Sequence, residues 1–230
     1  MAKGIKRIFS EVPHSYELIN HVLTWGMDVV WRRKAAKEAV KAGGDFGLDV
    51  CTGTGEMVQN LSRLAGQKVK LVASDFCSPM LEKAKEKTYN HKILFTLAEA
   101  NSLPFSNQTL DFITISFATR NINPRKEILI GHLKEFCRVL KPGGRFINLE
   151  TSQPSNGILR KLFHFYVRLL VKPVGYRLSG SEAAYQYLSF TIPRFYPPEE
   201  FSEILRQAGF RHITFRSLLS GVSAIHTAIK

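Results

Sequence analysis

The chain has 230 residues, of which 44% are hydrophobic and 22% are charged, which is typical of a folded globular domain and excludes a disordered chain. Its three cysteines, an odd number without metal-ligand spacing, argue against a disulfide framework. The net charge of +13 predicts a surface that attracts polyanions, either nucleic acid or an acidic lipid surface, without choosing between them.

The N-terminal part of the chain is predicted to be a helical lid. Residues 14–42 have a helical pattern that is broken around Trp25-Gly26, and Trp31, Ala35, Ala39 and Val40 form a plausible packed face. This segment precedes the first predicted strand, so it is free to close over a site on the sheet. No stretch reaches the roughly 18 to 20 apolar residues of a membrane span, and no apolar signal core is present, so we expect a cytoplasmic protein.

From residue 46 onward, short runs rich in Val, Ile and Phe alternate with helical stretches, a pattern typical of a mostly parallel sheet covered by helices. A helix at 198–208 separates the last two strands from the others, and these two are expected to pair antiparallel at a sheet edge. The predicted strands span residues 46–50, 69–74, 93–97, 110–116, 144–150, 211–218 and 222–229.

The fold class predicted from this pattern is α/β, with a doubly wound, mostly parallel seven-stranded sheet, helices on both faces and an antiparallel last strand. Residues 1–230 are read as a single domain. Within it we expect a helical lid, a cofactor-binding core, a cap insertion, and a final unit of one helix and two strands, with the bounds 1–42, 46–150, 151–197 and 198–230.

Helix boundaries are also indicated by single residues. Ser78 is predicted to cap a helix over 79–87, with Pro79 at its first position. The KPGG run at 141–144 is predicted to stop the helix that precedes it.

The cap insertion contains a basic, aromatic, amphipathic helix, predicted over 157–172. The chain has no acidic residue between Thr151 and Ser181. Two interpretations stay open for this helix: contact with an anionic membrane surface, or a cap whose apolar face packs over the active site while its basic residues are solvated.

A glycine-containing turn follows the first predicted strand directly. Asp49 lies in that strand, and Gly53, Thr54 and Gly55 form the turn, where only glycines let the backbone approach a ligand closely. Asp75 ends the next strand, where an acidic side chain can accept hydrogen bonds from both ribose hydroxyls of an adenosine. Turn and acid together predict a nucleoside pocket at the carboxyl edge of the sheet.

A dinucleotide is the obvious competing ligand. Its glycine pattern calls for glycine or alanine where this chain has Val58, and Asp49 would repel a pyrophosphate. The same carboxylate suits the ammonium of a methionine moiety. We therefore predict S-adenosylmethionine, which has no phosphate and a positively charged sulfur.

The ends of the third and fourth strands add candidates for this pocket. Glu99 and Ala100 follow the third strand, where they can meet the adenine edge. Ser116, Arg120 and Asn121 follow the fourth strand and are expected to emerge beside the sulfonium.

Motifs along nearly the whole chain together carry a resemblance to a known family. They are Tyr16-Glu17-Leu18-Ile19-Asn20, Trp25-Gly26, Trp31-Arg32, Leu48-Asp49-Val50, Gly53-Thr54-Gly55, Ser116, Arg120-Asn121, residues 138–144, Ala184-Tyr185-Gln186-Tyr187-Leu188, Gly221-Val222 and Ala224-Ile225-His226. In this order they resemble the ubiquinone/menaquinone biosynthesis C-methyltransferase family, which methylates the ring of polyprenylated quinols. The resemblance implies that Thr54, Asp75, Glu99, Ala100 and Ser116 bind S-adenosylmethionine. It also implies that Tyr16, Asn20 and Arg120 line the quinol site.

The resemblance implies C-methylation of a quinol ring. For this reaction our hypothesis is that Arg120 stabilises the developing phenolate. A water or a side chain, with His14 and Glu17 among the candidates, would accept the hydroxyl proton. It also implies work at the inner face of a membrane, and it leaves a homodimer open. Two alternatives remain: a methyltransferase for RNA or another small molecule, and a non-catalytic binding protein. We see no appended nucleic-acid module, so we do not expect a nucleic-acid partner.

Overall fold

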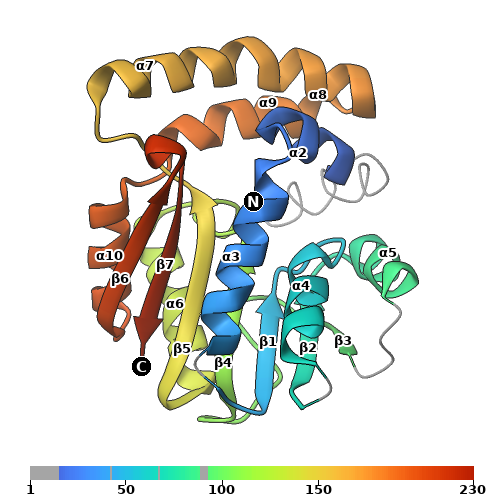
Figure 1. Ribbon diagram of the computed structural model, residues 1–230, viewed down its shortest axis with the longest axis vertical. Helices are drawn as coiled ribbons and strands as arrows, with labels where there is room; N and C mark the ends of the chain where they lie inside the picture. The colour runs from blue at the N-terminus through green and yellow to red at the C-terminus, as the bar shows by residue number, and fades with distance from the viewer. Residues whose placement is uncertain (1–15, 42, 67, 89–92) are drawn as a thin grey trace.

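The computed structural model shows one seven-stranded sheet with helices on both faces, as predicted (Figure 1). It describes residues 16–41, 43–66, 68–88 and 93–230. The strand order is β3-β2-β1-β4-β5-β7-β6. The strands are β1 (Phe46–Val50), β2 (Lys70–Asp75), β3 (Ile93–Leu97), β4 (Leu110–Ser116), β5 (Leu140–Thr151), β6 (Arg211–Leu218) and β7 (Ser223–Ile229).

The first five strands pair in parallel, and the chain reverses its direction of travel across the sheet between β1 and β4. In sheets of this kind, ligands bind beyond the carboxyl ends of the strands at that reversal. β7 lies antiparallel between β5 and β6, which confirms the predicted antiparallel last strand.

Helices cover both faces and the carboxyl edge of the sheet. The described helices are α2 (Tyr16–Thr24), α3 (Met27–Lys41), α4 (Glu56–Ala65), α5 (Ser78–Lys87), α6 (Lys126–Val139), α7 (Gly157–Tyr166), α8 (Lys172–Ser179), α9 (Glu182–Thr191) and α10 (Pro198–Gln207). Shorter helical segments are η1 (Val167–Val171), η2 (Ile192–Arg194) and η3 (Leu219–Gly221).

Two apolar cores lie on the two faces of the sheet. On one face, α3 and α4 bury Trp31, Ala35, Ala39 and Met57 against the strands. On the other face α6 and α10 pack. The break predicted at Trp25-Gly26 is confirmed, since α2 ends at Thr24 and α3 begins at Met27; Val40 is only partly buried on the predicted face.

A third core joins the lid to the cap. Ile19 of α2 packs with Val167, Val171, Tyr185 and Leu188 of the segment between β5 and α10. The Tyr166 hydroxyl also donates to the Leu23 carbonyl at 2.8 Å. In Figure 1, α7, α8 and α9 lie above the carboxyl ends of the strands, with α2 beneath them, so lid and cap form one roof over that edge.

Three sequence-based boundaries need correction. Ser78 does not cap α5, because it is already the first residue of the helix and its hydroxyl donates to Glu82. Cys77 holds the capping position, and its backbone N–H donates to the Asp75 carboxylate. The helix before the KPGG run ends at Val139, as predicted, but β5 begins at Leu140 rather than at residue 144, so the run lies within this strand. β2 covers 70–75 instead of 69–74.

The predicted helix over 157–172 is confirmed as helical, running through α7 and a π-helical segment, η1, into α8. No residue of α7 is buried. Among the described residues, no helix combines the length and apolarity that a bilayer crossing needs.

Candidate active site

The glycine turn after β1 is fixed by the end of β2. The Thr52 N–H donates to the Ser74 carbonyl at 2.9 Å, and the Gly53 N–H donates to the Asp75 carboxylate at 2.9 Å. Gly55 has a left-handed φ of 87°, and a Cβ there would lie 3.0 Å from the Ala84 Cβ. The turn therefore needs glycine at this position for both backbone and space.

Asp75 has two roles at this edge. Its carboxylate also accepts from the Cys77 N–H at 2.9 Å, so one side chain ties together the turn and the start of α5. Burial raises the pKa of Asp75, and the backbone N–H groups act against that rise.

A cavity of about 320 Å³, the first cavity, opens beside this turn. Six of the predicted cofactor residues line it: Gly53, Thr54, Asp75, Glu99, Ala100 and Ser116. They come from the ends of β1, β2, β3 and β4, so residues far apart in the sequence meet at one edge of the sheet, as parallel strands require.

Two predicted cofactor residues lie elsewhere. Gly55 is the N-terminal cap of α4 and does not line the first cavity, and Asp49 is fully buried beneath the turn. The Asp49 carboxylate accepts from the Thr52 hydroxyl at 2.5 Å and the Thr114 hydroxyl at 2.8 Å, so it holds the turn from behind, and its role toward an ammonium stays a prediction. Burial raises the pKa of Asp49 to about 7.

Several residues of the first cavity were not predicted from the sequence. Arg32 and Glu56 line it near the turn, and Asn101 and His132 line it near Glu99. A signal existed for two of them, because Arg32 belongs to the Trp31-Arg32 motif and Glu56 directly follows the glycine turn. His132 is in the middle of α6, where no sequence pattern marks it as a site residue.

A second cavity, of about 460 Å³, lies between the lid and the cap. Its lining is mainly apolar and includes Trp25, Leu162, Phe163 and Leu188, with Asn20 among the few polar residues. Arg32 and Phe117 line both cavities, so these two side chains form the wall between them.

Arg120 lines the second cavity, whereas Ser116 and Asn121 line the first, so the three residues predicted to lie together are divided between the two spaces. Arg120 is 7% exposed and forms an ion pair with Glu150, which is 1% exposed. The Arg120 N–H also donates to Glu150 at 3.1 Å. Glu150, at the end of β5, thus fixes both the guanidinium and its loop.

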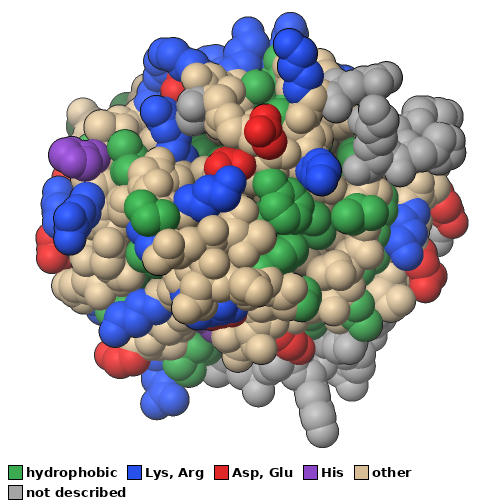
Figure 2. All heavy atoms as spheres, turned by 90° about the horizontal axis from the view of Figure 1, so that it is seen from below, with side chains coloured by type: hydrophobic (Ala, Val, Ile, Leu, Met, Phe, Trp, Pro, Cys, Tyr) green, Lys and Arg blue, Asp and Glu red, His purple; other side chains and the backbone are tan. Residues whose placement is uncertain are grey.

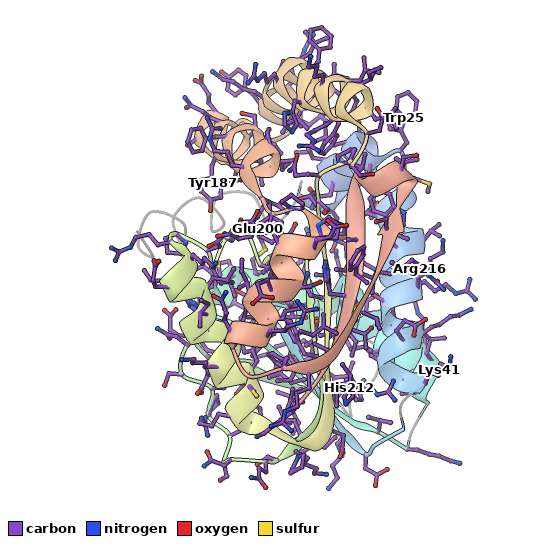
Figure 3. All side chains as sticks on the ribbon, turned by 90° about the vertical axis from the view of Figure 1, so that its left-hand side faces the viewer. Trp25, Lys41, Tyr187, Glu200, His212 and Arg216 are labelled. Atoms are coloured by element: carbon purple, nitrogen blue, oxygen red, sulfur yellow. The ribbon has the colours of Figure 1, made fainter. Side chains whose placement is uncertain are left out.

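Tyr187 of α9 belongs to the same polar group. It lies on the side of α9 that faces the sheet, whereas Trp25 projects outward at the rim (Figure 3). Burial raises the pKa of Tyr187, the charge of Arg120 lowers it, and Glu150 raises it. The phenol therefore stays protonated near neutral pH.

Four polar side chains, Arg32, Asp28, Glu56 and His21, join the lid to the first cavity. Arg32 pairs with Asp28 at 2.5 Å and with Glu56 at 3.1 Å. His21 pairs with Asp28 at 2.8 Å and with Glu56 at 3.3 Å. His21, Asp28 and Glu56 could together offer ligands to a metal ion, but the Arg32 guanidinium already supplies a positive charge to both carboxylates.

The remaining predicted lid residues divide as follows. Tyr16 begins α2, but its side chain, like His14, lies outside the described residues. Glu17 pairs with Lys87 of α5 and does not line either cavity.

The first cavity suits a nucleoside with an attached amino acid. Asp75 can accept from ribose hydroxyls, Glu99 lies at the end of β3, and Arg32 and Glu56 offer opposite charges near the turn. The Asn121 side-chain oxygen is buried and has no hydrogen-bond partner among the described residues, so it is ready to accept from a ligand.

A protein-family model described as the ubiE/COQ5 methyltransferase family matches residues 1–230. The chain is 32% identical to a ubiquinone/menaquinone biosynthesis C-methyltransferase UbiE of Desulfotalea psychrophila, over 99% of this chain and 90% of the relative. It is also 32% identical to a demethylmenaquinone methyltransferase of Staphylococcus saprophyticus, over 97% of this chain and 94% of the relative.

Solved structures share the fold. A SAM-dependent methyltransferase from Aquifex aeolicus aligns with a TM-score of 0.58 at 22% identity, over 84% of this chain and 88% of that one. Human N-acetylserotonin methyltransferase in complex with SAM aligns with a TM-score of 0.66 at 15% identity, over 94% of this chain and 55% of that one.

Proposed function

Because the chain belongs to the ubiE/COQ5 methyltransferase family, we propose that this S-adenosylmethionine-dependent methyltransferase methylates a ring carbon of a polyprenylated quinol. The observation that carries the proposal is the shared wall of Arg32 and Phe117 between a polar and an apolar cavity. The two cavities adjoin at this wall, so the methyl group of the donor and a ring carbon of the acceptor can come into direct contact beside it, as methyl transfer requires.

The first cavity takes the methyl donor. When bound, S-adenosylmethionine supplies an electrophilic methyl group on a positively charged sulfur. Asp75 would hold the ribose, and Glu99 and Ala100 would contact the adenine edge. Gly53 and Thr54 would contact the part of the cofactor that lies next to the glycine turn. Ser116 would lie toward the acceptor. Asp49 would act from behind the turn, by keeping Thr52 in place.

The second cavity takes the quinol ring. Its walls of Trp25, Leu162, Phe163 and Leu188 suit an aromatic ring and the start of a prenyl tail. Asn20 and Arg120 are polar groups in that lining, positioned to meet hydroxyl oxygens.

Arg120 supplies a fixed positive charge to the reaction. A quinol ring carbon becomes nucleophilic when a neighbouring hydroxyl loses its proton, and a nearby guanidinium stabilises the resulting phenolate. Because Glu150 holds Arg120 in place before substrate arrives, little reorganisation is needed. The hydroxyl proton goes to a water or side chain in the second cavity, and the ring carbon later releases its own proton.

Substrate access suggests a membrane-facing surface on α7. Ile158, Leu162, Phe165 and Leu169 are between 55% and 71% exposed, and their spacing places them on one side of the helical segment. Leu162 also lines the second cavity, so this exposed stripe continues into the proposed quinol site. The exposed Lys161 and Arg168 lie in the same segment.

Basic charge alone does not identify α7 as the lipid-binding surface. At the opposite end of the molecule, basic side chains are spread around the rim with acidic side chains among them (Figure 2). The combination of exposed apolar side chains, basic neighbours and the second cavity supports α7 as a contact with an anionic lipid surface.

The deciding experiment is methyl transfer from labelled S-adenosylmethionine to a lipid extract that contains reduced demethylated quinones, with an RNA pool as the parallel acceptor. We expect label in a quinol ring carbon, and the product identifies a benzoquinol or a naphthoquinol. Label in RNA, or label in neither acceptor despite cofactor binding, would contradict the proposal.

A further inference from the structure

Arg32 is the one lysine or arginine among the described residues that line the first cavity. It is 4% exposed, in the middle of α3, and its guanidinium lies 5.0 Å from the centre of the Phe117 ring. Three acidic residues, Glu56, Asp75 and Glu99, share this lining. A ligand with a carboxylate therefore has one place among these residues where that group meets a compensating charge.

The two acidic residues at the strand ends already have a use in the proposed complex. Asp75 ends β2 and Glu99 follows β3, so both lie toward the β3 edge of the sheet, where the nucleoside is proposed to bind. Glu56 differs, because it is the first residue of α4 and faces Arg32 of α3 at 3.1 Å. The opposite charges of this pair match the zwitterion of an amino acid.

The Arg32 guanidinium is held in place and can still donate hydrogen bonds to another partner. Its terminal nitrogens contact Asp28 and Glu56, but a guanidinium has five N–H donors, so these two contacts leave donors for a third group. Arginine with a carboxylate is a strong pair because several N–H groups can bind it together. Asp28 fixes the direction in which Arg32 points.

We propose that Arg32 binds the α-carboxylate and Glu56 binds the α-ammonium of the amino-acid part of S-adenosylmethionine, and that His21 and Asp28 connect this pair to the lid helix α2. The proposal rests on the methyl donor in the proposed function and is independent of the methyl acceptor. His21 contacts both Asp28 and Glu56, so the side chains that meet the amino acid also hold α2 on α3 and α4.

The test compares three ligands by calorimetry: S-adenosylhomocysteine, its decarboxylated amine, and methylthioadenosine, which lacks both charged groups. In Arg32→Gln we expect affinity for S-adenosylhomocysteine to fall at least tenfold while the other two change less than threefold. In Glu56→Gln we expect both amine-bearing ligands to weaken and methylthioadenosine to change less than threefold. Arg33→Gln, on the exposed side of α3, is the matched control.

Equal weakening of all three ligands by Arg32→Gln would show a scaffold role and overturn the proposal. If that variant does not fold, Arg32→Lys is measured instead. A retained preference for S-adenosylhomocysteine over the decarboxylated amine supports the proposal. Loss of this preference, together with weaker binding of methylthioadenosine, overturns it. Since none of these assays contains a methyl acceptor, failure of quinol methylation leaves their outcome unchanged.

Hydrogen exchange over residues 16–24 tests the connection to the lid. We expect S-adenosylhomocysteine to slow exchange in α2 more than methylthioadenosine does, and His21→Asn to remove most of that difference. Equal protection by the two ligands would contradict the connection.

Discussion

The guanidinium of Arg32 lies over the ring of Phe117, 5.0 Å from its centre, and these two side chains line both cavities. Phe117 follows β4 with a left-handed φ of 53°, an unusual backbone for a residue with a bulky side chain, and its N–H donates to the Leu149 carbonyl at 2.7 Å. The sheet thus holds a strained residue at the boundary, which is typical of functional positions.

Phe117→Leu should separate binding from reaction. The shorter side chain opens the wall between the cavities, so the reacting carbon is held less accurately against the methyl donor. We expect the rate of quinol methylation to fall roughly tenfold or more, and the affinity for S-adenosylhomocysteine to change less than threefold. Phe136→Leu, fully buried but away from both cavities, is the control; if it lowers the rate equally, the wall has no special role.

The Arg120–Glu150 pair allows stability and activity to be separated. Arg120→Gln leaves the Glu150 carboxylate buried without its cation, which should cost roughly 3–5 kcal/mol of unfolding free energy. It should also lower the single-turnover rate about 100-fold, as loss of a charge-stabilising donor does. The double variant with Glu150→Gln should regain stability in urea unfolding but not activity. Recovered activity would contradict a direct role for Arg120.

Much of the sheet and of the cofactor edge was predictable from the sequence, because both depend on local patterns. Apolar runs bounded by turns located all seven strands within a few residues, and the sequence alone placed Gly53, Asp75 and Glu99 at strand ends. Parallel strands bring such ends together, so a pattern along the chain predicts a meeting in space.

The shared wall and the ion-pair network were not predictable in this way. Arg32 lies in the middle of a helix, and although it belongs to the Trp31-Arg32 motif, that motif does not indicate that the side chain lines the first cavity. Asp49 shows the opposite case: its place in the motif predicts a cofactor contact, but the motif does not predict the two threonine hydroxyls that donate to its buried carboxylate. Both depend on how α3, α4 and β4 pack, which no single segment encodes.

Asp49→Asn should change how stability depends on pH. Because burial raises the pKa of Asp49 to about 7 from 3.8, the folded protein holds a proton that the unfolded chain has released between these values. Wild-type stability therefore loses a contribution as the pH rises from about 4 to about 7. We expect the variant to gain stability relative to wild type over that range in urea unfolding. A difference in unfolding free energy between the two proteins that stays constant over this pH range would contradict the raised pKa of Asp49.

His226 should affect the pH dependence of stability in the direction opposite to Asp49. It is 3% exposed, its Nε2–H donates to the Pro198 carbonyl at 3.0 Å, and burial lowers its pKa to about 4. Below about 6.5 the unfolded chain binds a proton that the fold does not, so stability falls by up to about 3 kcal/mol as the pH drops to about 4. His226→Gln should flatten this loss, as urea unfolding at pH 5 and pH 7 would show. If the difference in stability between pH 5 and pH 7 stayed the same in the variant, a residue other than His226 would be responsible for it.

Phe165→Asp tests the proposed membrane-facing surface against a matched position. Phe165 is 64% exposed on α7, and Leu94, at the far edge of the sheet on β3, is 62% exposed, so Leu94→Asp adds the same charge to a comparable apolar site. A carboxylate on α7 should repel anionic lipid and resist burial in the headgroup region. We expect only Phe165→Asp to lower cosedimentation with vesicles of phosphatidylcholine and phosphatidylglycerol.

The same pair of variants distinguishes lipid contact from damage to the quinol site. With a quinol embedded in those vesicles, kcat/KM should fall for Phe165→Asp, whereas with a short-tailed quinol in solution it should match wild type, because α7 would then be needed only for access. Added salt should weaken wild-type binding, since Lys161 and Arg168 contribute through exposed charge. Equal losses with both quinols would instead mean that α7 acts as part of the cavity wall, through Leu162, and has no separate lipid-binding role.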